Sequence, residues 1–394
     1  MVIGAGVVGA ACALAAVEAG LAVTVVDRGS IAGGTTGAGE GNILVSDKEP
    51  GAELELAMAS NGLWRELASR LDHDVELETK GGLVVTSAAE ELAALHALAA
   101  QQASAGVRIE PVDADQLPTY EPYLRRGLPG GVFYPQDLQV QPMLAAAAML
   151  HAAHWLGAQV RTGTEVTAIL RRSDGAVCGV DCAGVKLAAG CVINAAGTWA
   201  GSVAALAGAQ IPVRPRRGFI LVTAPAPTLV LHKVYNAGYV TDVASAAASL
   251  QSSAVVEGTR SGTILIGATR EIVGFERDLS LLALQRLAAQ AVELFPVLAK
   301  IDVLRAYQGF RPYSPDHLPI IGADPIVAGL FHACGHEGAG IGLAPVTARL
   351  VVDAILGRPP VVDPTPFTPG RFISEEQADK PAGEQRTTDQ RSWT

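Results

Sequence analysis

The sequence predicts an α/β protein with two interleaved domains. One is built on a parallel sheet with helices and a small β-meander, and the other is an α+β domain built on a largely antiparallel sheet. The chain opens with a short strand, a glycine turn, an alanine-rich helix and a second strand. Its middle carries strand-like runs separated by turn residues, and a second glycine-rich segment precedes a helix near residue 340. These observations carry the prediction.

The opening segment, residues 1–27, indicates the type of the first domain. A short apolar run leads into Gly4-x-Gly6-x-x-Gly9, an alanine-rich helix ends at Gly20, and residues 21–26 form a second apolar run closed by Asp27. The order strand, turn, helix, strand is the context in which this pattern indicates a Rossmann-like dinucleotide-binding fold. A signal peptide or membrane span is not expected, because no basic region precedes the run and Glu18 and several glycines interrupt it.

Each glycine of the motif has a distinct physical role. Gly4 permits the turn, Gly6 lets the backbone approach a pyrophosphate, and Gly9 lets the helix pack closely on the strand. We expect the pyrophosphate at the positive end of the helix that begins near Val7. The carboxylate of Asp27 is placed to accept hydrogen bonds from an adenosine ribose.

Composition narrows the class of protein. A net charge of −10 argues against nucleic acid as a partner, and no basic run indicates a membrane surface. The five cysteines are scattered and contain no C-x-x-C pair, so we expect a cytoplasmic protein without structural disulfides or a metal site.

The remaining elements follow in chain order. Helices are expected over residues 54–71, 88–106, 142–156, 279–295 and from about 340 to 357, the last with Pro345 near its start and Gly357 after its end. A meander is expected over 159–161, 166–171, 177–181 and 184–187. Other strands are expected at 81–86, 131–134, 191–195, 213–223, 234–241, 253–257, 263–269 and 304–309.

These elements divide the chain into interleaved segments. We assign residues 1–77, 142–212 and 305–368 to the first domain, and residues 78–141 and 213–304 to the second. Residues 369–394 are polar and charged, and we expect a disordered tail there.

Several stretches, in order along nearly the whole chain, resemble the D-amino-acid oxidase-type (DAO) family of FAD-dependent oxidoreductases. They are the opening motif, Thr35-Thr36-Gly-Ala-Gly-Glu-Gly-Asn42, Asn194-Ala-Ala-Gly197-Thr-Trp199, Gly309-Phe-Arg311-Pro-Tyr-Ser-Pro-Asp-His-Leu-Pro-Ile-Ile-Gly322 and Gly335-His-Glu-Gly-Ala-Gly-Ile-Gly342. Within the family, the second and last stretches most resemble glycine oxidases and the bacterial subunits that act on D-hydroxyproline, on opines, or on glycine in cyanide formation.

The resemblance implies FAD as the cofactor, and the sequence gives an independent reason. A second glycine-rich segment more than three hundred residues after the first indicates a ligand held at both ends, whereas a nicotinamide enzyme needs only the first. Some members of the family attach the flavin through a cysteine near the start of the Arg311 segment, and residues 305–314 contain none, so the resemblance implies non-covalent FAD. The expected FAD-binding residues are Gly4, Ala5, Gly6, Val7, Val8, Gly9, Asp27, Arg28, Thr35, Thr36, Gly41, Asn42, Val166, Ala196, Gly197, Trp199, Gly335, His336, Glu337, Gly338, Gly340 and Ile341.

The resemblance also implies catalytic roles. Arg311 is expected to hold the substrate carboxylate, for which a planar guanidinium is suited, although it could instead pair with Asp316 or a main-chain carbonyl. His336 is a candidate acid–base group or a packed residue. Tyr239 is a candidate for orienting the substrate from the second sheet, and Tyr235 and His232 are weaker candidates there. Glu40, a lone charge among glycines, either meets a substrate amine or faces water.

These roles together predict an oxidoreductase that transfers hydride from the CH–NH bond of an amino or imino acid to flavin N5, after which the imine hydrolyses. A D-hydroxyproline-like substrate is the first choice, followed by an opine, glycine or sarcosine. One alternative is a dehydrogenase of a 2-hydroxy acid or polyol phosphate. Another is an FAD-carrying subunit that is inactive alone. The expected electron acceptor is O2, a partner subunit or the respiratory chain, and a homo- or hetero-oligomer is compatible with these roles.

Overall fold

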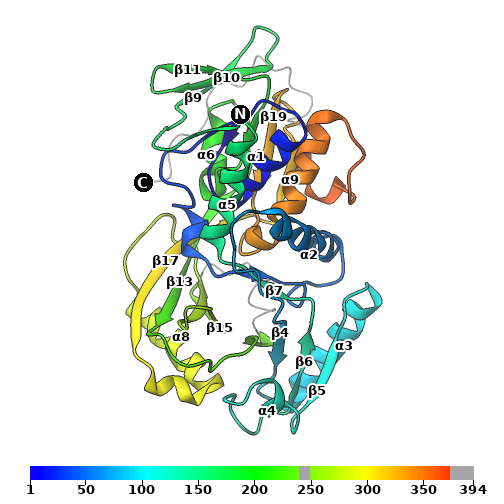
Figure 1. The fold of residues 1–394 in the computed structure, drawn as a ribbon, viewed down its shortest axis with the longest axis vertical. Helices are drawn as coiled ribbons and strands as arrows, with labels where there is room; N and C mark the ends of the chain where they lie inside the picture. The colour runs from blue at the N-terminus through cyan, green and yellow to red at the C-terminus, as the bar shows by residue number, and fades with distance from the viewer. Residues whose placement is uncertain (239–248, 373–394) are drawn as a thin grey trace.

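The computed structural model describes residues 1–238 and 249–372. Two sheets dominate this part of the chain. The parallel sheet and its helices occupy the upper half of Figure 1, and the larger sheet occupies the lower half, with α2 (Ala52–Arg70) between them. Among the helices of these residues, none combines the length and the hydropathy that a membrane span requires. The mixed α/β architecture predicted from the sequence is confirmed.

The first sheet is parallel except at one edge, where β18 pairs antiparallel with β19. Residues 159–161, expected in the meander, instead form an edge strand of this sheet. That prediction was wrong because a run of three residues is too short to show which sheet it joins. The strand order is β18 (Ile320–Ala323), β19 (Leu330–Cys334), β12 (Val192–Asn194), β1 (Val2–Ile3), β2 (Thr24–Val26) and β8 (Gln159–Arg161).

Both faces of the parallel sheet are covered. Side chains alternate along a strand, so Val2 and Val25 belong to one hydrophobic cluster and their neighbours Ile3 and Val26 to another. The first face packs against α1 (Val7–Glu18), α5 (Pro142–Trp155) and α9 (Gly340–Leu356). The other packs against the meander of β9 (Ala168–Arg171), β10 (Val177–Cys182) and β11 (Val185–Ala188), and against α6 (Ala200–Ala205).

The second sheet has eight strands, antiparallel except where β14 pairs with β4. The helix α8 (Leu281–Leu294) packs against it, and α3 (Ala89–Ser104) and α4 (Leu117–Tyr120) lie near its other edge. The strand order is β17 (Val303–Tyr313), β13 (Arg214–Thr223), β16 (Ile264–Arg270), β15 (Gln251–Gly258), β14 (Lys233–Asn236), β4 (Gly82–Val85), β6 (Gly130–Tyr134) and β5 (Glu110–Asp113).

Two places differ from the expected segments. The strand β17 crosses the boundary expected at residue 305, so Arg311 lies in the second sheet. Residues 369–372, placed in the disordered tail, form a short 3-10 helix in which Arg371 pairs with Asp316 at 2.6 Å, while residues 373–394 lie outside the described residues. A small two-stranded sheet pairs β3 (Asn42–Ile43) antiparallel with β7 (Leu138–Gln139), outside both large sheets.

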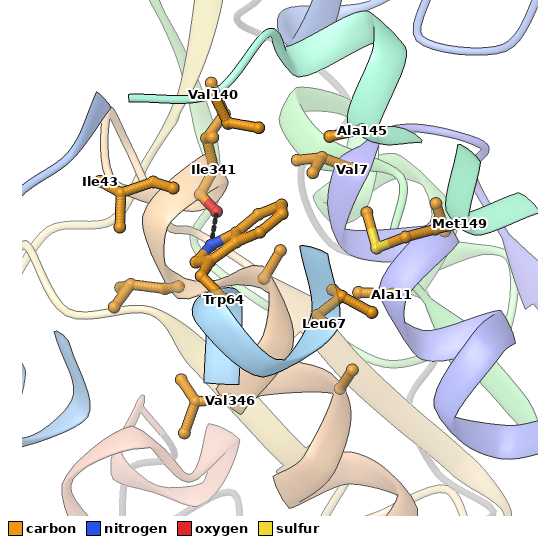
Figure 2. Packing of buried hydrophobic residues seen from close by; sticks show 14 of the residues in the cluster. Val7, Ala11, Ile43, Trp64, Leu67, Val140, Ala145, Met149, Ile341 and Val346 are labelled. Atoms are coloured by element: carbon orange, nitrogen blue, oxygen red, sulfur yellow. Dashed lines mark hydrogen bonds between the residues drawn. The ribbon is translucent and has the colours of Figure 1, made fainter. Parts of the chain in front are cut away.

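The helix α2 is fixed to the first turn of α9 by a buried tryptophan (Figure 2). The Trp64 Nε1 donates to the carbonyls of Ile341 and Gly342, at 2.9 and 3.1 Å. The Ser60 hydroxyl donates to the Gly342 carbonyl at 2.6 Å. Around the indole, Val7 and Met149 bring in α1 and α5, so one side chain joins four helices.

Replacement of the indole tests this contact. We expect Trp64→Phe to lower the free energy of unfolding by about 1–3 kcal/mol, because two buried carbonyls lose a donor while most of the apolar volume remains. Urea denaturation followed by circular dichroism measures the change. Trp155→Phe, at a side chain that is 75% exposed, is the control. Equal losses in both variants would contradict the assigned role.

Candidate functional site

A cavity of about 780 Å³ lies where the two sheets meet. Seven separate segments line it: the glycine turn at residues 3–8, the stretch 26–42, residues 164–167 and 195–206, the strands around 218–220 and 309–312, and the closing loop at 333–341. This volume is typical of a site for a cofactor or small molecule. Several of these segments coincide with the motifs singled out in the sequence.

The glycine turn has the geometry that its sequence predicts. Gly4 has a φ of +116°, and a Cβ built on Gly9 would lie 1.9 Å from the Gly4 carbonyl oxygen, so only glycine allows α1 to pack this closely. Gly4, Gly6, Val7 and Val8 line the cavity. The turn therefore brings the start of α1, with its main-chain amides, to the cavity wall.

Asp27 lies at one end of the cavity, directly after β2. Its Oδ2 accepts a hydrogen bond from the Ala5 amide at 2.7 Å, and its Oδ1 accepts one from the Gly29 amide at 2.7 Å. Each oxygen keeps a further lone pair. The carboxylate is thus held in a fixed orientation, with acceptor capacity left for a hydroxyl donor.

The loop after Asp27 joins the glycine turn to the second sheet. The Thr36 Oγ1 accepts from the Val7 amide at 3.0 Å. The hydroxyls of Thr35 and Thr198 both donate to the carbonyl of Phe310 on β17, at 2.7 and 2.8 Å. Three segments far apart in the sequence are therefore fixed around the cavity.

An aromatic stack forms part of the wall beside this loop. The Arg28 guanidinium lies 4.3 Å from the centroid of the Trp199 ring, and that ring stacks on Phe275 at 5.3 Å with an interplanar angle of 6°. Arg28 and Trp199 line the cavity together with Val166, Ala196 and Gly197. The Trp199 ring thus forms a flat, apolar part of the cavity wall, with the Arg28 guanidinium over it.

The closing loop lies between the end of β19 and the start of α9. His336, Glu337, Gly338, Gly340 and Ile341 line the cavity. The first-turn amides of a helix have no partner inside it, so the start of α9 presents donors and a positive dipole end to the cavity.

Glu337 uses both its main chain and its side chain within the protein. Its amide, expected to face the cofactor, donates to the Pro312 carbonyl at 3.0 Å. Its carboxylate pairs with Arg216 at 3.3 Å and with His317 at 2.9 Å. The bond that Arg216 donates to the Glu337 carboxylate and the bond that the Glu337 amide donates to Pro312 fasten the closing loop to β13 and β17.

His336 lies in contact with helix α9. Its Nε2 is 2.9 Å from the Thr347 Oγ1, and burial lowers the pKa of the imidazole to about 3. A neutral ring engaged with a hydroxyl suits fixing the loop better than proton transfer. Tyr239, the candidate for orienting the substrate, lies outside the described residues.

Arg311 lies on the cavity wall from β17. Its Nη1 donates to the Thr269 carbonyl at 2.9 Å, and a Cβ on Gly218 would come within 2.1 Å of that nitrogen. Asp316, the alternative partner considered from the sequence, pairs instead with Arg371. The bare backbone at Gly218 is what gives the guanidinium its room.

Four of the expected cofactor residues support the cavity without lining it. Ala5 donates to Asp27, Gly9 packs under Gly4, and a Cβ on Gly41 would lie 1.9 Å from the Val140 carbonyl. Gly335 has a φ of +72° beside Ile320. Tyr235 is fully buried, with its hydroxyl donating to the Ser46 Oγ at 2.6 Å, and it lines neither this cavity nor its neighbour.

Other lining residues have no place in the sequence-based set. Six of them, Ala38, Gly39, Ala195, Gly309, Phe310 and Pro312, lie inside the quoted stretches and could have been found by taking each stretch whole. Gly218, Ile220 and Arg277 could not, because no motif marks them. The further lining residues outside the quoted stretches are Ile3, Val26, Gly29, Ser30, Gly33, Gly34, Thr164, Glu165, Thr167, Ser202, Val203, Leu206, Ala333 and Cys334.

Comparison with known proteins decides the family. A model described as "FAD dependent oxidoreductase", DAO, matches residues 1–354. The chain belongs to the DAO family of FAD-dependent oxidoreductases. It is 32% identical over 336 residues to the hydrogen cyanide synthase subunit HcnC of Pseudomonas aeruginosa, covering 84% of this chain and 76% of HcnC. It is 29% identical to the glycine oxidase of Geobacillus kaustophilus, covering 95% of this chain and 97% of that enzyme.

Solved structures agree with this assignment. The crystal structure of the Geobacillus kaustophilus glycine oxidase superposes with a TM-score of 0.85 at 27% identity, covering 95% of this chain and 98% of that one. The L-proline dehydrogenase of P. horikoshii shares the fold, with a TM-score of 0.85 at 23% identity and coverage of 94% and 96%.

FAD is the cofactor of this DAO-family chain, and the cavity fits it. The glycine turn and Asp27 on its wall are suited to a pyrophosphate and a ribose. The amide end of α9 on its wall is suited to the negative charge that a reduced flavin carries. The ring of Trp199 and the bare backbone at Gly4 and Gly6 also line it.

The Asp27 carboxylate gives a test of this fit. We expect Asp27→Ala to weaken FAD binding about 10- to 100-fold, because it removes a charged acceptor worth about 1.5–3 kcal/mol at the ribose and unties Ala5 and Gly29. The fluorescence of FAD released on dilution measures the dissociation constant. Asp72→Ala, at an exposed aspartate, is the control. Equal FAD retention by the two variants would contradict the role.

Proposed function

We propose that this DAO-family chain oxidises the CH–NH bond of a small amino or imino acid. The observation that carries the proposal is the guanidinium of Arg311 on the wall of the cavity that fits FAD. A guanidinium forms paired hydrogen bonds with a planar carboxylate, and one of its nitrogens is already fixed by Thr269. An acid bound there is aligned for reaction.

Two adjoining cavities support room for a small substrate beside the cofactor. A second cavity of about 280 Å³ adjoins the first, since Asn42, Arg311, His336, Glu337 and Gly338 line both. Bound FAD would supply the hydride acceptor. The protein's contribution is orientation, because a carboxylate fixed by Arg311 leaves the α-carbon with few positions to occupy.

The nature of the substrate follows from what the site offers. An imino acid such as D-hydroxyproline is our first choice, with an opine, glycine or sarcosine next. The printed names of two relatives, glycine oxidase and a hydrogen cyanide synthase subunit, support a small substrate in this family. The engagement of His336 with Thr347 does not favour oxidation of a 2-hydroxy acid, which needs a base for the hydroxyl proton.

The electron acceptor is a separate question. The relative HcnC is named as a subunit, which supports the possibility that this chain too passes electrons to a partner. Oxygen consumption by the purified chain, compared with reduction of an artificial dye, separates a self-sufficient oxidase from a subunit of a dehydrogenase.

The proposed reaction is tested by mixing the FAD-loaded chain anaerobically with candidate substrates and following loss of flavin absorption. The panel contains D- and L-amino acids, imino acids, opines and 2-hydroxy acids. We expect bleaching with at least one amino or imino acid and none with the hydroxy acids. Bleaching by hydroxy acids alone would reject the proposal.

Arg311 is tested with the substrate that this panel identifies. We expect Arg311→Lys to keep FAD and to raise the substrate concentration at half-maximal bleaching about 10- to 100-fold, since lysine keeps the charge but loses the paired hydrogen bonds. Unchanged bleaching at low substrate would exclude Arg311 as the anchor.

A substitution at Gly218 tests the role of Arg311 without changing Arg311 itself. A Cβ at this position would lie 2.1 Å from the Arg311 Nη1 and 2.6 Å from the Thr269 carbonyl oxygen that holds it, so Gly218→Ala is expected to displace the guanidinium and to weaken substrate binding at least tenfold. Gly62→Ala is the matched control, because no atom lies within 4 Å of its Cβ. The binding constant comes from the same bleaching titration. Wild-type affinity in both variants would count against the contact.

A further inference from the structure

Glu40 has an unusual environment in the wall of the cofactor cavity. It belongs to the glycine-rich loop before β3 and is only 7% exposed. Its carboxylate lies over Gly267 on β16, where an added Cβ would come within 2.4 Å of Oε1 and 2.7 Å of Oε2. A buried carboxylate thus rests on bare backbone beside the site.

The hydrogen bonds of this carboxylate are incomplete. The Asn42 side-chain amide donates to Oε2 at 3.3 Å. The Oε1 atom is buried and has no hydrogen-bond partner among residues 1–238 and 249–372. Since a buried, unsatisfied acceptor costs about 1–3 kcal/mol, a donor supplied by a ligand would offset that cost.

Glu40 and Arg311 lie near each other along one strand. Gly267 and Thr269 are two residues apart on β16, and the charges of Glu40 and Arg311 lie within electrostatic reach of each other. The Glu40 carboxylate rests on the first, and the Arg311 guanidinium is held by the carbonyl of the second. An anion and a cation side by side complement a zwitterion, whose carboxylate and ammonium carry the opposite charges.

We propose that Glu40 binds the ammonium group of the substrate and accepts its proton. The inference rests on the proposed function, since it assumes that Arg311 holds the substrate carboxylate. One N–H bond of the ammonium breaks and an O–H bond forms at Oε1 of Glu40. The amine keeps the electron pair of the broken bond as its lone pair, and that pair assists the departure of hydride from the α-carbon.

The electrostatic surroundings suit a group that binds and releases a proton. The pKa of the Glu40 carboxyl is raised to about 7, because the raising effects of burial and of the Glu257 charge outweigh the lowering effects of Lys233, Arg311 and Arg270. The hydroxyl of Tyr307 also lies within electrostatic reach. Lys233 and Glu257 form a buried ion pair, and the Glu257 carboxylate accepts from the Gly41 amide at 3.4 Å, beside Glu40 in the chain.

This assignment makes Glu40 a determinant of specificity. A 2-hydroxy acid has the same carboxylate but no positive charge to pair with the Glu40 carboxylate, so it gains nothing from that charge. An amino or imino acid satisfies both charges. The pair Glu40 and Arg311 therefore selects amines over alcohols at the substrate site.

Binding of inert ligands tests the inference without turnover. 2-Methylalanine and 2-methylproline have a carboxylate and an ammonium but no α-hydrogen, so they cannot be oxidised. Pivalate and 1-methylcyclopentane-1-carboxylate have the same shapes without the nitrogen. We expect the FAD-loaded wild type to bind at least one amine-bearing ligand tenfold or more tightly than its carbon analogue, measured by perturbation of the flavin absorption. Glu40→Gln is expected to reduce that ratio to about threefold or less.

The pH dependence gives a second readout. Protonation of Glu40 removes the negative charge, so the preference of the wild type for the ammonium ligand should fall as pH decreases from 8 to 5.5. Glu40→Gln should show no such change, and Glu40→Asp should restore part of it. Glu90→Gln, at an exposed glutamate on α3, is the control for the loss of one charge. FAD content and the urea midpoint confirm that each variant is folded.

The outcomes separate this inference from the proposed function. If carboxylates bind but the ratio is the same in wild type and Glu40→Gln, the role of Glu40 is rejected and the carboxylate anchor stands. If the wild type binds neither kind of ligand and no amino or imino acid bleaches the flavin, the proposed function itself fails.

Discussion

The carbonyl oxygen of Phe310 is the point on which the arrangement of this molecule depends. It accepts hydrogen bonds from Thr35, in the loop after the glycine turn, and from Thr198, in the turn after a strand of the parallel sheet. Phe310 itself belongs to β17 of the second sheet, next to Arg311. One backbone acceptor thus fixes the cofactor-binding segments relative to the strand that carries the proposed anchor, and two domains enclose one cavity.

Buried ion pairs are the second feature that fixes the geometry around the cavity. Lys233 with Glu257, and Arg216 with Glu337, form ion pairs that water scarcely reaches. Such pairs seldom stabilise a fold more than apolar packing would, because each ion loses its hydration. Their value lies in orientation, since a displaced partner leaves an isolated charge. Glu337 lines the cavity, and Glu257 accepts from the Gly41 amide between two lining residues, so both pairs fix the positions of groups around the cavity.

Sequence reasoning found the parts of the site that local patterns encode. The glycine turn, Asp27, the loop at Thr35 and the closing loop could be recognised because each needs particular residues at fixed spacing. Gly218 and the pairing of Arg216 with Glu337 could not, since they depend on the register between β13 and β17 and on contacts over more than a hundred residues. The roles of His336 and the Glu337 amide depended on partners that no spacing reveals.

The bare backbone at Gly218 has a consequence for how related chains diverge. A side chain there would meet both the Arg311 guanidinium and the Thr269 carbonyl oxygen, at 2.1 and 2.6 Å from an added Cβ, so a change at position 218 displaces both the cation and the strand that holds it. Under the proposed role of Arg311, a homologue with a larger residue at the equivalent of position 218 would need another cation for an acidic ligand. Under that proposal, position 218 sorts members of the lineage that hold a carboxylate in this way from those that do not.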